Sequence, residues 1–241
     1  MGRTFENRKQ TMLKRGDRDA KAFTRAGRQI AMAVRAGGPE LEANPALRRA
    51  VQNARAVNMP KDRIQNAIDK AAGASDSDDY QQIFYEGYGP HGIALIIEAA
   101  TDNPTRTVAN VRFAFKKENG NLGASGSVSF MFDYFGVFRI SPEGVERDEL
   151  ELELIDHGLE DIVETEDDAG KPLLALRCVR ENFGSLQSAL EEHKVAVDSS
   201  GFEWVPKTTT ELGDAEADEV IKLIDRLEQD DDVQAVFHNL A

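Results

Sequence analysis

The chain has 241 residues and a formal net charge of −14, and with 41% hydrophobic and 30% charged residues it has the composition of a globular protein of two or three domains. Its single cysteine, Cys178, excludes an intramolecular disulfide framework and indicates a reducing compartment. No apolar run is long enough to cross a membrane and no secretory signal opens the chain, so we expect a soluble, cytoplasmic protein.

Charge is divided unevenly along the sequence. Residues 1–72 hold 16 Lys and Arg against 7 Asp and Glu, a net charge of +9, whereas residues 73–241 hold 13 against 36, a net charge of −23. A phosphate backbone responds to the local field, so the acidic total does not exclude a nucleic-acid partner. A solvated helix surface is the alternative explanation for such a run of charges.

The first predicted element is an amphipathic helix that includes residues 17–36. Wound at about 100° per residue, its cations fall on one arc, away from the apolar residues. These cations are Arg18, Lys21, Arg25, Arg28 and Arg35. Because acidic residues are nearly absent from this arc, the like charges repel one another and favour a polyanionic partner.

Two shorter helices follow, and proline marks the start of each. Asn44 is the expected N-cap of a helix that has Pro45 at its first position and runs to about Asn58. The next helix begins near Pro60. Together the three helices predict a small bundle, followed by a polar hinge at residues 73–79.

Strands and helices alternate beyond the hinge. Residues 83–88 and 93–99 are predicted strands, and Asn103 caps a helix that begins at Pro104. We expect this helix to pack through Val108, Val111, Phe113 and Phe115, and residues 128–132 to form a third strand.

The next stretch has the order strand, helix, strand, strand, helix, strand, which is the ferredoxin-like arrangement. The predicted ranges are 137–140, 147–156, 161–165, 173–179, 183–193 and a last strand after 195–197. A strand at 202–206, a helix at 214–227 and a strand at 233–238 would then complete the half-unit begun by residues 93–132. We therefore predict an α+β multidomain fold: a basic helical domain (1–78), a ferredoxin-like α/β domain (79–133 plus 202–241), and a second one (134–201) inserted in it.

Several motifs along the chain resemble those of the YebC/PmpR family, in the same order. They are Asn44-Pro45, Asn58-Met59-Pro60-Lys61-Asp62, Tyr85-Glu86-Gly87-Tyr88-Gly89-Pro90, Thr101-Asp102-Asn103-Pro104-Thr105-Arg106-Thr107, Asn119-Gly120-Asn121-Leu122-Gly123 with Gly126-Ser127-Val128, Asp231-Asp232-Val233-Gln234 and His238-Asn239. The resemblance implies a helical domain with two α/β domains, and a probable DNA-binding transcriptional regulator, with other members acting on the ribosome as translation factors. One departure is at the start, where many members have Gly-His-Ser-Lys-Trp-Ala-Asn and this chain has Gly2-Arg3-Thr4-Phe5-Glu6-Asn7.

An enzymatic function finds no support in the residues. The glycines of residues 119–127 follow a predicted helix and precede a strand, the reverse of a phosphate-binding loop. His91, His157, His193 and His238 lack metal-ligand spacing, and Cys178 alternates with Leu174 and Leu176 like a core thiol. The acidic clusters at 164–168 and 230–232 fall at turns and show no partner base or ligand set. We predict no catalytic residue, no metal site and no cofactor.

The predicted partner is a nucleic acid, either DNA or RNA within the ribosome. We do not expect the protein to bind a membrane. We call residues 1–72 the head and residues 73–241 the acidic body. The expected contact residues are twelve cations of the head and one cation of the family motif that begins at Thr101. They are Arg3, Arg8, Lys9, Lys14, Arg15, Arg18, Lys21, Arg25, Arg28, Arg35, Arg48, Arg49 and Arg106. The basic arc offers few Asn or Gln for reading base edges, so the expected contacts are mainly to phosphates. The acidic body would repel extended duplex DNA, which favours a role on the ribosome. The broader description of the family favours transcriptional regulation, and we rank that function first.

Overall fold

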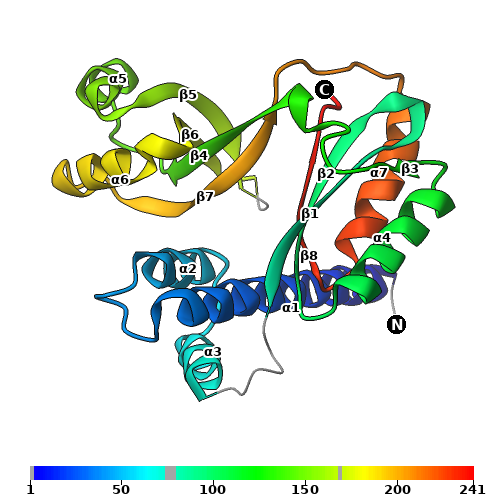
Figure 1. Cartoon of the computed structure of the whole chain (residues 1–241), viewed down its shortest axis with the longest axis horizontal. Helices are drawn as coiled ribbons and strands as arrows, with labels where there is room; N and C mark the ends of the chain where they lie inside the picture. Colours follow the sequence, from blue (N-terminus) through cyan, green and yellow to red (C-terminus); the bar gives the residue numbers. More distant parts are fainter. Residues whose placement is uncertain (1–2, 74–79, 168–169) are drawn as a thin grey trace. The chain divides into compact units, whose positions relative to one another are not determined.

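The computed structural model describes residues 3–73, 80–167 and 170–241, and within residues 3–19 it describes the backbone alone. It contains an N-terminal helical region and two four-stranded antiparallel sheets with their helices (Figure 1). Among the described residues, none of the helices combines the length and the apolar character needed to cross a bilayer. The predicted hinge at residues 73–79 falls almost entirely outside the described part of the chain.

The helical region consists of α1 (Arg3–Gly37), α2 (Pro45–Ala56) and α3 (Lys61–Gly73). Their apolar stripes meet in one core, whose fully buried members include Ile30, Leu47 and Ala54. The predicted bundle is therefore confirmed, and α1 is longer than the amphipathic segment from which it was inferred.

Asn44 fixes the turn between α1 and α2. Its side-chain oxygen accepts a hydrogen bond from the Leu47 amide at 3.0 Å, as expected of an N-cap. Its amide nitrogen donates to the carbonyl oxygens of Ala33 at 2.7 Å and Gly38 at 2.8 Å. Because Asn44 is almost fully buried, one side chain satisfies polar groups from the end of one helix and the start of the next.

The first sheet contains β1 (Gln81–Tyr88), β2 (Ala94–Thr101), β3 (Asn121–Leu122) and β8 (Val233–His238), in the order β3-β1-β2-β8. Two helices accompany these strands in the chain, α4 (Pro104–Lys117) and α7 (Asp214–Glu228). β2 is a central strand of this sheet, and seven of its eight residues are buried. Its almost continuous apolar run reflects that position.

The second sheet contains β4 (Phe132–Ile140), β5 (Leu159–Glu166), β6 (Pro172–Val179) and β7 (Val197–Pro206), in the order β5-β6-β4-β7. Helices α5 (Arg147–Leu154) and α6 (Phe183–Glu192) share one core with these strands. Cys178 lies in that core with no exposed surface, which confirms the prediction of a packed thiol. Burial raises the pKa of this thiol to about 11.

One predicted strand and one predicted sheet assignment were wrong. Residues 128–132 form no strand, because Ser129–Met131 is a 3-10 turn and Phe132 already begins β4. Residues 202–206 belong to β7, where Phe202 pairs with Gly136 and Pro206 with Phe132 of β4. They do not complete the first sheet, in which β1 and β2 are the two central strands.

Phe113 is a further correction. It was expected to pack beneath α4, yet its side chain is 62% exposed. Val111, Ala114 and Phe115 of the same helix are buried, so they form the apolar face of α4 and Phe113 lies outside it.

Glu86 of β1 holds the loop that follows β3. Its carboxylate accepts hydrogen bonds from the backbone amides of Gly126, Val128 and Ser129 at 2.8–2.9 Å. Burial alone would raise the pKa of Glu86, but these three amide donors outweigh it and lower the pKa below its ordinary value. The bonds explain why residues 128–129 turn instead of extending as a strand.

Candidate nucleic-acid interface

The basic arc of α1 meets the turn between α7 and β8. Arg28 Nη1 lies 2.8 Å from the carboxylate of Asp232, forming an ion pair in which the two side chains are 13% and 3% exposed. The same guanidinium donates to the carbonyl oxygens of Ala100 at 2.9 Å and Asp231 at 2.5 Å. Arg28 therefore joins α1 to the end of β2 and to the start of β8.

Arg25 makes a parallel contact one turn earlier in α1. Its guanidinium donates to the carbonyl oxygens of Val233 at 3.0 Å and Glu228 at 3.1 Å. Glu228 ends α7, where the last carbonyl groups of a helix have no partner within it. A cation at this end also interacts favourably with the helix dipole.

Asp232 is the centre of a buried polar cluster. Its carboxylate accepts hydrogen bonds from Thr107 Oγ1 at 2.7 Å, Thr101 Oγ1 at 3.2 Å and Arg106 Nη2 at 2.8 Å, in addition to that from Arg28. Burial alone would raise the pKa of Asp232, but the hydrogen bonds from Thr107 and Arg106 and the charge of Arg28 outweigh it and lower the pKa. Asp232 is therefore ionised at neutral pH.

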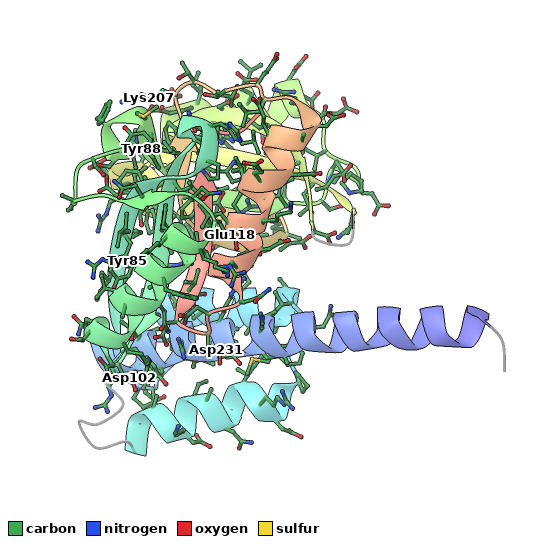
Figure 2. The ribbon with its side chains drawn as sticks, turned by 90° about the vertical axis from the view of Figure 1, so that its right-hand side faces the viewer. Tyr85, Tyr88, Asp102, Glu118, Lys207 and Asp231 are labelled. Atoms are coloured by element: carbon green, nitrogen blue, oxygen red, sulfur yellow. The ribbon has the colours of Figure 1, made fainter. Side chains whose placement is uncertain are left out.

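Arg106 bridges two carboxylates. Besides Asp232, its guanidinium donates to Asp102 Oδ1 at 2.8 Å, four residues earlier in the chain. Asn103 accepts from the Arg106 amide at 3.1 Å and so caps α4. Hydrogen bonds to Asp232 and then Asp102 raise the pKa of Arg106. Figure 2 labels Asp102 and Asp231, which mark the two turns of this cluster.

These contacts correct one expectation. The like charges on the basic arc of α1 were expected to repel one another because acidic residues are nearly absent there, but Asp232 and four backbone carbonyl groups compensate Arg25 and Arg28. In the acidic cluster at 230–232, Asp232 forms ion pairs with Arg28 and Arg106. Arg25, Arg28 and Arg106 are thus engaged within the chain, and nucleic-acid binding by them stays a prediction.

The remaining predicted contact residues are placed differently. Arg35 and Arg48 are exposed, while Lys21 and Arg49 are half-buried, and Arg48 donates to the carbonyl oxygens of Leu41 and Glu42 at 2.9 and 2.7 Å. Further exposed cations of the head are Arg55, Lys61, Arg63 and Lys70. The side chains of Arg3, Arg8, Lys9, Lys14, Arg15 and Arg18 lie outside the described part of the structure.

Two histidines lie close to glutamates, and His91 has a second one, Glu216, at 3.9 Å from Nδ1. His91 Nε2 lies 3.1 Å from Glu219, and His193 at the end of α6 lies 3.0 Å from Glu153. Within the ranges that the structure describes, no three His, Cys, Asp or Glu side chains gather as a metal site would require. The Asp232 cluster was not foreseen, because its members lie far apart in sequence.

Family models match both parts of the chain. Residues 3–74 match the model of the TACO1/YebC protein N-terminal domain, and residues 80–240 match that of the TACO1/YebC second and third domain. The boundary between the two matches falls in the predicted hinge.

Individual relatives are similar over the whole chain. A probable transcriptional regulatory protein of Anaeromyxobacter dehalogenans is 55% identical over 241 residues, and one of Myxococcus xanthus is 54% identical, with 100% of each chain covered. One from Flavobacterium johnsoniae is 49% identical over 240 residues, covering 100% of this chain and 99% of the relative. The crystal structure of a conserved hypothetical protein from Aquifex aeolicus superposes with a TM-score of 0.80 at 37% identity, covering 92% of this chain and 90% of that one.

Proposed function

Because the chain belongs to the TACO1/YebC family, we propose that it is a non-enzymatic, nucleic-acid-binding regulator of gene expression in the cytoplasm. The first candidate activity is DNA-binding transcriptional regulation, since similar proteins are named probable transcriptional regulatory proteins. The helical region supplies the binding surface in this proposal.

The observation that carries the proposal is the opposite charge of the two parts of the sequence. The first 72 residues have a net charge of +9, and six of their cations are exposed, namely Arg35, Arg48, Arg55, Lys61, Arg63 and Lys70. Cations of this kind neutralise phosphates and release counterions, which drives binding that depends on salt and not on sequence. The remaining residues, at −23, favour a contact confined to the head.

Binding of full-length protein to duplex DNA as a function of salt tests the proposal. If Arg55 and Lys61 each meet a phosphate, replacing both by Gln should reduce the slope of log K against log salt by about two contacts' worth, at about 0.9 per contact. The matched control is Lys116→Gln with Lys117→Gln, because these exposed cations occupy the last turn of α4. A slope that changes equally in both variants, or in neither, contradicts a role for the head.

The second candidate is a translation factor that binds RNA on the ribosome. The strongly acidic remainder favours it, because a long duplex would be repelled while a head inserted into a structured ribonucleoprotein site would not. Full-length protein should be compared on promoter duplex, random duplex and ribosomes at one near-physiological salt concentration. A promoter preference below about tenfold, or about 1.4 kcal/mol, together with saturable ribosome binding, supports the translation factor over the transcription factor.

The proposal extends to domain organisation. We infer a basic helical domain followed by a ferredoxin-like α/β domain, in which a second ferredoxin-like domain is inserted between β3 and α7. The second sheet supports this, because β4, α5, β5, β6, α6 and β7 follow one another without interruption from Phe132 to Pro206. An isolated fragment of this range that unfolds cooperatively would support the insertion, and an unfolded fragment would count against it.

A further inference from the structure

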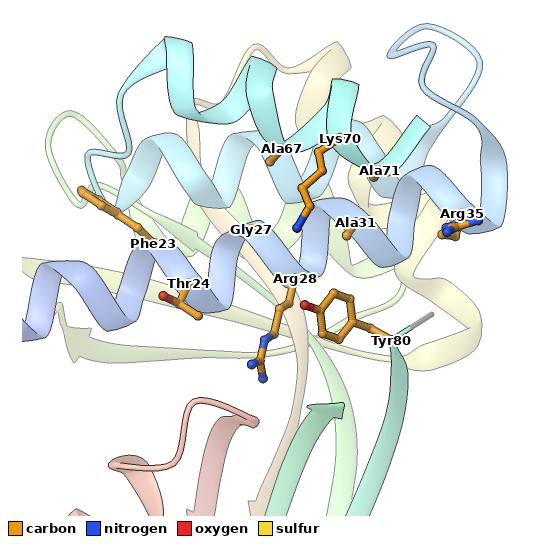
Figure 3. Close-up of a pocket in the computed structure, with 10 residues that line it drawn as sticks. All are labelled: Phe23, Thr24, Gly27, Arg28, Ala31, Arg35, Ala67, Lys70, Ala71 and Tyr80. Atoms are coloured by element: carbon orange, nitrogen blue, oxygen red, sulfur yellow. The ribbon is translucent and has the colours of Figure 1, made fainter. Parts of the chain in front are cut away.

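A pocket opens between α1 and α3 on the helical region (Figure 3). It has a volume of about 250 Å³, and its lining comes from α1, α3 and the residue before β1. The lining residues are Phe23, Thr24, Gly27, Arg28, Ala31, Arg35, Ala67, Lys70, Ala71 and Tyr80. Each of them lies within the described part of the chain.

Small residues create the space. Gly27 and Ala31 lie one turn apart on α1, and Ala67 and Ala71 lie one turn apart on α3. A Cβ atom built on Gly27 would have no heavy-atom neighbour within 4 Å, so the helix surface there is open. The floor of the pocket is consequently apolar, and the aromatic rings of Phe23 and Tyr80 lie on its border (Figure 3).

The charged part of the lining has a single sign. Arg28, Arg35 and Lys70 are cationic, and no acidic side chain is among the ten residues. Arg28 already pairs with Asp232, and its guanidinium carbon lies 5.2 Å from the centre of the Tyr80 ring. Its role in the pocket is therefore to position the Tyr80 ring through a cation–π contact. Arg35 and Lys70 are exposed, and the several N–H donors of such groups allow each to bind a phosphate while keeping another partner.

We propose that this pocket receives one unpaired base of a bound nucleic-acid strand, with Tyr80 as its stacking partner and Arg35 and Lys70 as ligands of the adjacent phosphates. An aromatic face beside cations is how proteins bind single strands without reading sequence. The inference rests on the proposed nucleic-acid function and specifies the form of the ligand. It predicts that single strands, or duplexes with an extruded base, gain affinity that regular duplex DNA does not.

The size and charge of the pocket argue for this occupant. Its volume lies below the range of about 300–1,000 Å³ in which drug-sized molecules bind, so it suits one flat group and not a helix. A base presents an apolar face to the floor and leaves its phosphates at the cationic border. A neutral apolar ligand would make no electrostatic contact with the cations Arg35 and Lys70 at the border of the pocket.

The test uses full-length protein and fluorescently labelled oligoadenylate on the order of ten nucleotides long. Gly27→Leu fills the pocket without changing charge, and leucine favours a helix over glycine, so folding is expected to survive. Gly184→Leu is the matched control, since Gly184 is an exposed glycine of α6 and a Cβ there also has no neighbour within 4 Å. A second pair, Tyr80→Ala and Tyr80→Phe, removes or keeps the stacking ring.

The expected result is a loss of affinity for oligoadenylate of about 5- to 150-fold with Gly27→Leu and Tyr80→Ala, the range measured for single stacked bases. Tyr80→Phe and Gly184→Leu should bind like the parent, and duplex binding should be the same in all four variants. An oligonucleotide of abasic sites should bind the parent as weakly as oligoadenylate binds Gly27→Leu.

Each contrary outcome has one meaning. If the parent binds nucleic acids but Gly27→Leu and Tyr80→Ala bind oligoadenylate unchanged, the pocket inference is overturned and the proposed function stands. If adenosine monophosphate binds as tightly as the oligomer, the site takes a free nucleotide and the strand is the wrong ligand. If the parent binds no nucleic acid at all, the proposed function itself fails.

Discussion

Replacing Asp232 by asparagine should destabilise the protein strongly, although the two side chains have the same shape. The substitution leaves Arg28, which is only 13% exposed, without a counter-ion, and it removes one of the two carboxylates that bind Arg106. Breaking a buried ion pair by removing one partner costs about 3–5 kcal/mol. Because Arg106 is 46% exposed and water can replace part of its bond, we expect the lower end, about 3 kcal/mol.

The assay is urea unfolding of the full chain followed by far-ultraviolet circular dichroism, which reports on the helices. Asp231→Asn is the matched control, because Asp231 is exposed and contributes its backbone carbonyl, not its carboxylate, to Arg28. The control should cost less than about 0.5 kcal/mol, as exposed substitutions generally do. A double-mutant cycle with Arg106→Gln should return a coupling energy of about 0.5–3 kcal/mol.

Two results would refute this reasoning. One is a cost for Asp232→Asn below about 1 kcal/mol, which would mean that the carboxylate contributes no more than an ordinary hydrogen bond. The other is equal destabilisation by Asp231→Asn and Asp232→Asn, which would assign the effect to the turn and not to the ion pair.

Three further predictions follow from the buried polar groups. Asp232 and Glu86 both have lowered pKa values in the folded protein. Their ionised carboxylates therefore stabilise the fold above the unfolded pKa values of 3.8 and 4.5, and this stabilisation is lost as the pH falls through the pKa values of the folded state. Urea midpoints measured from pH 7 to pH 2 should accordingly drop below about pH 4. Asn44→Ala should cost about 2 kcal/mol in urea unfolding, because it removes an N-cap and two further side-chain hydrogen bonds, whereas Asn66→Ala, at an exposed position of α3, should cost little. Cys178, with a pKa of about 11 and no exposed surface, should resist iodoacetamide at pH 8 until the protein is unfolded, and rapid labelling of native protein would contradict its burial.

Local signals in the sequence were sufficient for most helices. Asn44 and Pro45 define the start of α2 through a hydrogen bond three residues away, and Asn103 and Pro104 do the same for α4. Such signals depend on neighbours in the chain, so a single sequence contains them. The apolar periodicity of residues 17–36 likewise separated the cations from an apolar face, and the structure buries Ile30 and Val34 of this segment.

Contacts between distant residues account for the failures. Residues 128–132 are mostly apolar, but Glu86, some forty residues earlier, accepts hydrogen bonds from the amides of Val128 and Ser129. Arg28 and Asp232 are separated by 204 positions, so the charge pattern of α1 alone suggested an unpaired surface. Strand pairing is similarly non-local, and the extended character of residues 202–206 did not specify which sheet they would join.

In the loop after β3, the residues that are anchored by hydrogen bonds to Glu86 differ from the residues that are exposed at its tip. Ala124 and Ser125 are exposed at its tip, whereas the anchoring carboxylate lies in β1 and is almost fully buried. Surface positions of this kind tolerate substitution at a cost within about 0.5 kcal/mol, while Gly126, with a φ of +86°, favours glycine. The tip can therefore vary in chemistry while its path is kept, which makes it a suitable place to introduce a label or a new side chain without refolding the sheet.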